Sequence, residues 1–172
     1  MLNDLLQLLG VAIWFILPAY VANATPVVLG GGAPIDGGKL FRDGRPIFGA
    51  GKTIRGFVAG LIAGSLVGVL QGVVAGQAYT YVLLGLLLAL GALVGDLLGS
   101  FIKRRLNIPR GGAAPVLDQL GFVVFALLFA SPIMVIMVLR WEVILTILLI
   151  TPPIHLATNF VGYKLGFKSR PY

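Results

Sequence analysis

Five long apolar stretches constrain this chain more than any other feature of its sequence. They cover approximately residues 5–28, 54–76, 81–102, 117–139 and 143–163. A helix needs about 20 mostly apolar residues to cross the hydrocarbon core of a bilayer. Lipid cannot hydrogen-bond to the backbone, so a spanning segment must satisfy its own polar groups, as a helix does. The sequence therefore predicts an all-α, multi-pass membrane protein with five transmembrane helices in one domain, residues 1–172.

The composition supports this class and excludes several others. Hydrophobic residues make up 58% of the 172 residues and charged residues only 11%, whereas soluble domains carry about 25% charged residues. Disordered chains combine low hydrophobicity with high charge, so disorder is excluded as well. The absence of cysteine rules out a disulfide framework, thiolate catalysis and cysteine-bound metals.

The distribution of the cations predicts the orientation in the membrane. With five spans, the two long links at about 30–53 and 103–116 lie on the same side as the C-terminal tail. That side holds twelve of the thirteen lysines and arginines, and only Arg140 lies on the other. Positive charge collects in cytoplasmic loops. We therefore expect the N-terminus outside, the C-terminus and both long loops in the cytoplasm, and no nucleic-acid partner for the net charge of +7.

Glycines recur every fourth residue in two of the predicted spans. The second span contains them from Gly56 to Gly76, and the third repeats the spacing from Gly91 to Gly99. Glycines at this spacing share a helix face and allow another backbone to approach closely. This pattern predicts tight helix packing, within one chain or between chains of an oligomer. A second interpretation is that part of the smooth face holds a lipid tail.

The first span contains Pro18, Asn23 and Pro26. Proline inside a helix removes a backbone hydrogen bond and kinks or ends the helix. We therefore expect this span to kink or unwind near its second end.

The carboxylate of Asp96 lies well inside the third apolar stretch. A charged residue there costs about 2.5–3.5 kcal/mol on insertion scales and is by default a candidate for a functional site. The alternative is a structural ion pair with a nearby arginine. At 100° per residue, Asp96, Ser100 and Lys103 share one helix face, with Arg104 beside them. This face presents a carboxylate, a hydroxyl and two cations toward the cytoplasm.

A second carboxylate, Asp118, follows the basic loop at the start of the fourth span. Mg²⁺ is usually held by one or two carboxylates, with waters and substrate phosphates as further ligands. Asp96 and Asp118 are therefore a candidate Mg²⁺ site. Cations around them would meet phosphate charge, and the loop carries a flexible glycine pair; these residues are Lys52, Arg55, Lys103, Arg104, Arg105, Arg110, Gly111 and Gly112. The set predicts polyphosphate chemistry at the cytoplasmic face of the cell membrane.

The segment Gly49–Thr53 reads Gly-Ala-Gly-Lys-Thr and is similar to part of a P-loop. That motif also needs a glycine where Pro46 stands and a strand before it, so an NTPase is excluded. His155 is a lone histidine in the fifth span, and we expect a packed, neutral side chain there.

Two segments resemble the signature of the CTP:phosphatidate cytidylyltransferases. Residues 95–104 read Gly-Asp-Leu-Leu-Gly-Ser-Phe-Ile-Lys-Arg, and residues 115–120 read Pro-Val-Leu-Asp-Gln-Leu. The first long loop resembles the archaeal branch of that family, the CDP-archaeol synthases. It reads Pro-Ile-Asp-Gly-Gly-Lys at residues 34–39 and Asp-Gly-Arg-Pro-Ile-Phe-Gly-Ala-Gly-Lys-Thr-Ile-Arg-Gly at residues 43–56. The resemblance covers most of the chain and includes its length and five spans.

The resemblance implies roles for particular residues. Asp96 and Asp118 would be the metal ligands for Mg²⁺. Ser100, Lys103 and Arg104 would hold phosphates of the nucleotide or of the lipid. The pocket would be completed from the first span and loop by Asn23, Asp43, Lys52, Thr53 and Arg55. Gln119 and Gly121 stand where the larger family has an arginine and a further aspartate. Whether the site binds one metal ion or two therefore stays open.

The implied reaction joins CTP and a lipid phosphate with two ether-linked isoprenoid chains, unsaturated archaetidic acid, into CDP-archaeol and pyrophosphate. One alternative is a phosphatidate cytidylyltransferase acting on ester lipids. A CDP-alcohol phosphotransferase is disfavoured because its dense aspartate pattern is missing. A small transporter with Asp96 coupling ions is less expected, because transport sites lie near the bilayer midplane and these charges lie at one surface. The basis of cytosine selectivity, the position of the lipid chains and the oligomeric state also stay open.

Overall fold

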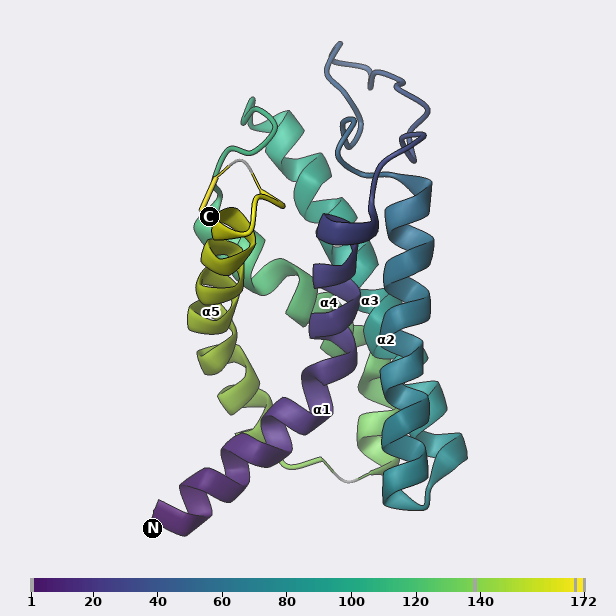
Figure 1. Ribbon diagram of the computed structural model, residues 1–172, viewed down its shortest axis with the longest axis vertical. Coiled ribbons are helices and arrows are strands. Elements are labelled where there is room, and N and C mark those ends of the chain that lie inside the picture. Colours follow the sequence, from purple (N-terminus) through teal and green to yellow (C-terminus); the bar gives the residue numbers. More distant parts are fainter. Residues whose placement is uncertain (1, 138, 169, 172) are drawn as a thin grey trace.

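The computed structural model describes residues 2–137, 139–168 and 170–171, and it consists of five helices (Figure 1). All five are long and apolar enough to cross a membrane. Within the described residues there are no strands, only two isolated β-bridges in the first long loop, so the predicted all-α, five-helix class is confirmed. Which side faces the cytoplasm stays a prediction. The helices are α1 (Leu2–Leu29), α2 (Ile54–Ala75), α3 (Ala78–Arg105), α4 (Pro115–Ile136) and α5 (Trp141–Lys164).

Short-range signals explain where several helices begin and end. The Thr53 hydroxyl caps α2 by accepting a hydrogen bond from the Gly56 N–H at 3.1 Å. Gly76 ends α2 with a left-handed backbone, φ 64°. Pro115 stands in the first turn of α4, where its missing N–H costs nothing. α3 continues through the basic triplet at 103–105. Cations at a helix C-terminus are stabilising there because that end of the helix dipole is negative.

The helix α3 is the centre of the bundle and packs against α1, α2 and α4. The helix α5 contacts only α1 and α4, and among the described residues no close backbone contact joins it to α3. The main apolar core lies between α1, α3, α4 and the first half of α5. α5 is therefore joined to the rest of the bundle through α1 and α4 (Figure 1).

The glycine rows pack helix against helix within this chain. A Cβ atom built on Gly64 of α2 would lie 2.7 Å from the Pro18 carbonyl oxygen of α1. One built on Gly68 would lie 2.7 Å from the Cα of Gly85 in α3. In α3, a Cβ on Gly91 would lie 2.5 Å from the Phe125 carbonyl oxygen of α4. At these glycines the close-packing interpretation is therefore correct.

The helix α1 stays helical through Asn23 and Pro26, so the expected unwinding is wrong, but the helix changes direction along its length (Figure 1). Pro18 has no N–H to donate to the Trp14 carbonyl four residues earlier. The buried side chain of Gln71 in α2 donates to that carbonyl at 2.5 Å. A neighbouring helix thus satisfies the polar group that proline leaves open, as the bilayer requires.

We expect Gly91→Ala to lower the free energy of unfolding by about 1–3 kcal/mol, the usual effect of overpacking a close interface. The matched control is Gly10→Ala in α1, where an added Cβ meets nothing within 4 Å. Unfolding in mixed detergent micelles measures both. Equal stability of the two variants would contradict tight α3–α4 packing.

Candidate active site

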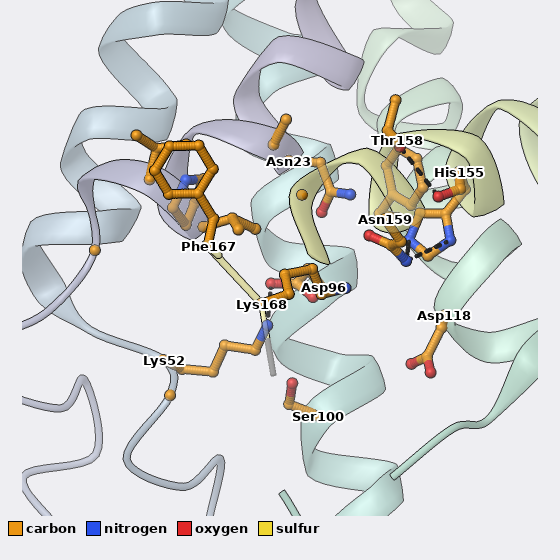
Figure 2. A pocket seen from close by; sticks show the side chains of 18 of the residues that line it. Asn23, Lys52, Asp96, Ser100, Asp118, His155, Thr158, Asn159, Phe167 and Lys168 are labelled. Carbon is orange, nitrogen blue, oxygen red and sulfur yellow. Dashed lines mark hydrogen bonds and ion pairs between the residues drawn. The ribbon is translucent and has the colours of Figure 1, made fainter. Parts of the chain in front are cut away.

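A cavity of about 930 Å³ lies between α1, α3, the start of α4 and α5. Its wall carries apolar side chains mainly from α1 and α3, several polar side chains from α5, and charged side chains where the long loops and the tail after α5 meet (Figure 2). The charged side chains in its wall are five cations and two carboxylates: Lys52, Lys103, Arg110, Lys168, Arg170, Asp96 and Asp118. This excess of positive charge suits a polyanionic ligand.

A smaller cavity of about 460 Å³ adjoins this charged end. Its wall is made by the first long loop and the last two turns of α3, including Phe48, Gly49 and Arg104. The two cavities share Lys52, Ser100, Lys103 and Arg110, together with Ala50, Gly51 and Gly111. The shared residues therefore border a place where two ligands could meet.

The two predicted metal ligands are each paired with a lysine. The Asp96 carboxylate lies 2.5 Å from the Lys52 ammonium of the first long loop. The Asp118 carboxylate accepts two hydrogen bonds of 2.9 Å from Lys103 of α3 and one of 2.9 Å from the Ala114 N–H. Removing a charged carboxylate from water is costly unless an opposite charge is paired with it. The partner of Asp96 is thus a lysine from a distant loop, not a nearby arginine.

The first long loop is held in shape by one buried carboxylate. Asp36 accepts hydrogen bonds from the backbone N–H groups of Phe48 at 2.9 Å and of Gly49 and Gly38 at 3.0 Å. Burial raises the pKa of Asp36, but these N–H groups lower it, and the pKa lies below its ordinary value. The carboxylate thereby holds the chain just before Lys52.

The same loop is clasped to the end of α3. Arg105 stacks over Phe41 and Phe101 at 4.8 and 4.9 Å from the ring centroids and lies 3.0 Å from the carboxylate of Asp43. In return, Arg45 donates a hydrogen bond to the Arg105 carbonyl oxygen, one of the carbonyls left open at a helix end. The clasp fixes the loop relative to the α3 face that carries Asp96.

Most of the predicted site residues gather at the cavities. The larger cavity is lined by Asn23, Lys52, Thr53, Asp96, Ser100, Lys103, Arg110, Gly111, Gly112 and Asp118, and the smaller one also by Arg104. Asp43 and Arg55 line neither: Asp43 belongs to the clasp, and Arg55 is exposed at the start of α2. Thr53 acts as the cap of α2. The substrate roles of all these residues stay predictions.

Several lining residues escaped prediction from the sequence. His155, Thr158 and Asn159 of α5 face the cavity (Figure 2). Their spacing of three and four residues inside an apolar span is a signal that could have found them. His155 lies near the Phe122 ring, with 6.0 Å between ring centroids, as a packed residue would. Phe167 and Lys168 also line the cavity, but they belong to the tail and no helical period indicates them.

The donor set fits Mg²⁺ but not a metal held by protein ligands alone. No group of three or more histidines, cysteines or carboxylates converges among the described residues. The cavity wall offers two carboxylates, and Mg²⁺ commonly takes one or two with substrate phosphates as the remaining ligands. Asp96 and Asp118 would hold such an ion together with a bound polyphosphate.

Comparison with known proteins gives consistent matches over nearly the whole chain. The family model described as CarS-like, CDP-archaeol synthase, matches residues 5–172. The CDP-archaeol synthases of Thermococcus gammatolerans and Pyrococcus horikoshii are 54% and 51% identical in sequence to this chain. These alignments cover 94% and 99% of this chain and 95% and 99% of the relatives.

One solved structure is also similar. It is described as an intramembrane enzyme for archaeal membrane lipid biosynthesis and aligns with a TM-score of 0.76 at 44% identity. The alignment covers 86% of this chain and 92% of that structure.

Replacing Asp36 tests whether this carboxylate holds the loop. We expect Asp36→Ala to speed hydrogen exchange at the Phe48 and Gly49 amides by about tenfold or more, because a hydrogen bond to a charged group contributes about 1.5–3 kcal/mol. In the unaltered protein, the lowered pKa keeps this stabilisation complete above about pH 3.9, the ordinary aspartyl value, and it is lost as the pH falls through the folded-state pKa.

Hydrogen exchange followed by mass spectrometry measures the effect. Glu142→Ala, at the opposite end of the bundle, is the control. Unchanged protection at residues 48–49 in Asp36→Ala would contradict the role of Asp36.

Proposed function

The chain belongs to the CDP-archaeol synthase family and is a cytidylyltransferase acting on a lipid phosphate, and we propose that its substrates are CTP and unsaturated archaetidic acid. The latter is a glycerol phosphate with two ether-linked geranylgeranyl chains. The products are CDP-archaeol, a precursor of archaeal membrane phospholipids, and pyrophosphate. The active site faces the cytoplasm from the cell membrane.

The observation that carries the proposal is the junction of the two cavities. The smaller cavity is bounded by loop backbone and cations and contains no wall from α1 or α5, which suits a nucleotide arriving from water. The larger cavity continues past apolar side chains of α1 and α3, such as Leu17 and Leu93, which suits a lipid. Both end at Lys52, Ser100 and Lys103. A nucleotide phosphate and a lipid phosphate would meet there.

The reaction needs positioning more than proton transfer. An oxygen of the lipid phosphate attacks the α-phosphorus of CTP, a new P–O bond forms, and the bond to the bridging oxygen of the β-phosphate breaks. Pyrophosphate leaves with the electron pair. A phosphate monoester has its second pKa near about 6, so the nucleophile is already an anion at neutral pH and requires no general base. The site must instead bring two anions together.

The lysines and arginines at the junction perform that task. Lys52 and Lys103 pair with Asp96 and Asp118, and incoming phosphates offer these lysines new anionic partners. Asp96 and Asp118 would hold Mg²⁺ against the nucleotide. When bound, Mg²⁺ neutralises charge on the transferred and leaving phosphates. This exchange of partners keeps both carboxylates compensated before and after the substrate enters.

Removal of either carboxylate charge tests the site. We expect Asp96→Asn and Asp118→Asn each to lower kcat by at least about a hundredfold, because charge stabilisation in a dry site contributes several kcal/mol. The matched control is Glu142→Gln, a carboxylate at the other end of the bundle. Melting temperatures in detergent show whether the variants fold. Near-normal turnover in a folded variant removes that residue from the active site.

The substrates and the metal are tested together by pyrophosphate release from the purified protein. We expect release with CTP, the ether lipid phosphate and Mg²⁺, and none after EDTA until Mg²⁺ is restored. ATP, GTP and UTP replace CTP in parallel reactions, and an ester-linked phosphatidic acid replaces the ether lipid. Preference for the ester lipid would favour a phosphatidate cytidylyltransferase. Turnover without a divalent cation would contradict the proposed metal site.

A further inference from the structure

The chain after α5 turns back toward the larger cavity. Gly166 adopts a left-handed backbone with φ 78°, and its N–H donates to the Tyr163 carbonyl at 3.0 Å. The Phe167 N–H donates to the Gly162 carbonyl at 2.9 Å. These two bonds form a Schellman motif, which ends a helix and reverses the chain through glycine. The direction of the tail (described residues 165–168 and 170–171) is therefore set by the end of α5.

This turn places Lys168 in the cavity wall. The side chain is half-buried, and its Cγ and Cδ run past Gly162, where an added Cβ would lie 3.6 Å away. Burial and the charges of Lys52 and Lys103 lower the pKa of Lys168, while the carboxylates of Asp118 and Asp96 act in the opposite direction. Figure 2 shows Lys168 at the charged end of the cavity with Asp96.

Arg170 connects the other end of the tail to the basic loop between α3 and α4. Its guanidinium donates to the Gly111 carbonyl oxygen at 3.5 Å, and its Cδ would lie 3.8 Å from a Cβ on Gly111. The tail therefore extends from the end of α5 to the loop that precedes Asp118. Its described residues thus contact α5 at one end and the basic loop at the other.

Lys168 adds to the positive charge at this end of the cavity. The wall carries five cations, Lys52, Lys103, Arg110, Lys168 and Arg170, against the two carboxylates of Asp96 and Asp118. A half-buried excess of cations is unfavourable until an anion enters. A phosphate dianion would offset it with short charge-assisted hydrogen bonds.

The two cavities indicate which phosphate this is. Lys168 and Phe167 line the larger cavity and are absent from the smaller one. Phe167 adds apolar surface to the wall of the same cavity, which also has apolar side chains from α1 and α3 such as Leu17 and Leu93. A cation in a cavity with an apolar lining matches the headgroup end of a lipid phosphate better than a nucleotide triphosphate.

We propose that Lys168 is a further substrate-binding residue, which holds the phosphate of the lipid substrate, and that the tail places it in the cavity that Lys52 and Lys103 also line. This proposal rests on the proposed function. The lysine acts by binding and takes no part in bond formation. The Schellman turn at Gly166 is what delivers it.

Steady-state kinetics of Lys168→Gln test the proposal. We expect the KM for the ether lipid phosphate to rise at least tenfold, with the KM for CTP changed by less than about twofold. Lys168→Arg, which keeps the charge, restores most of the loss. The matched control is Lys164→Gln, a lysine one turn earlier that stacks on Phe160 and lines neither cavity among the described residues.

A second variant separates the lysine from its placement. Gly166→Ala puts a side chain on a left-handed backbone without creating a contact within 4 Å, so it should reproduce part of the rise in lipid KM while Lys168 is still present. Equilibrium binding of the lipid phosphate without CTP should weaken in parallel for both variants.

An unchanged lipid KM in folded Lys168→Gln overturns the proposal. A selective rise in the KM for CTP also overturns it and assigns the lysine to the nucleotide. Failure of the proposed function is distinct, because the unaltered protein would then release no pyrophosphate from CTP and the ether lipid phosphate.

Discussion

Charge compensation at the edge of an apolar bundle is the interaction on which this structure depends. A carboxylate such as Asp96 is costly inside an apolar helix unless a cation accompanies it. Lys52 and Lys103 supply those cations from a loop and from the α3 face itself. Lysine has a flexible side chain, and in the proposed mechanism it passes from the carboxylate to a phosphate, while Mg²⁺ would compensate Asp96 and Asp118.

The bundle gives these pairs a cavity by packing its two sides differently. Glycines let α2, α3 and α4 approach to backbone contact, as at Gly68 with Gly85 and at Gly91 with Phe125. The helix α5 has no such contact with α3. The larger cavity lies on this less closely packed side, between α1, α3, α4 and α5. Its apolar lining and charged end are the features on which the proposed lipid phosphate site rests.

Loops decide the geometry of the charged end. Lys52 reaches Asp96 because the buried Asp36 carboxylate gathers the chain at 48–49, and the Arg45–Arg105 clasp ties that loop to α3. Asp43 shows why resemblance alone does not place a residue: it matches the family pattern, yet it pairs with Arg105 and lines neither cavity. Its contribution is to the clasp. The tail with Lys168 is placed in the same way, by backbone geometry.

The sequence by itself determined the five helices, the carboxylate and cations on one face of α3, and the family. Each follows from local information: apolar length, a helical period or a contiguous motif. Only the tertiary structure decided that Lys52 pairs with Asp96, that Asp36 holds the loop, and that Lys168 returns to the cavity. Those contacts join residues far apart in the chain or depend on a loop's conformation. These contacts are stabilised by burial and by partner residues from distant parts of the chain, which a short sequence segment does not contain.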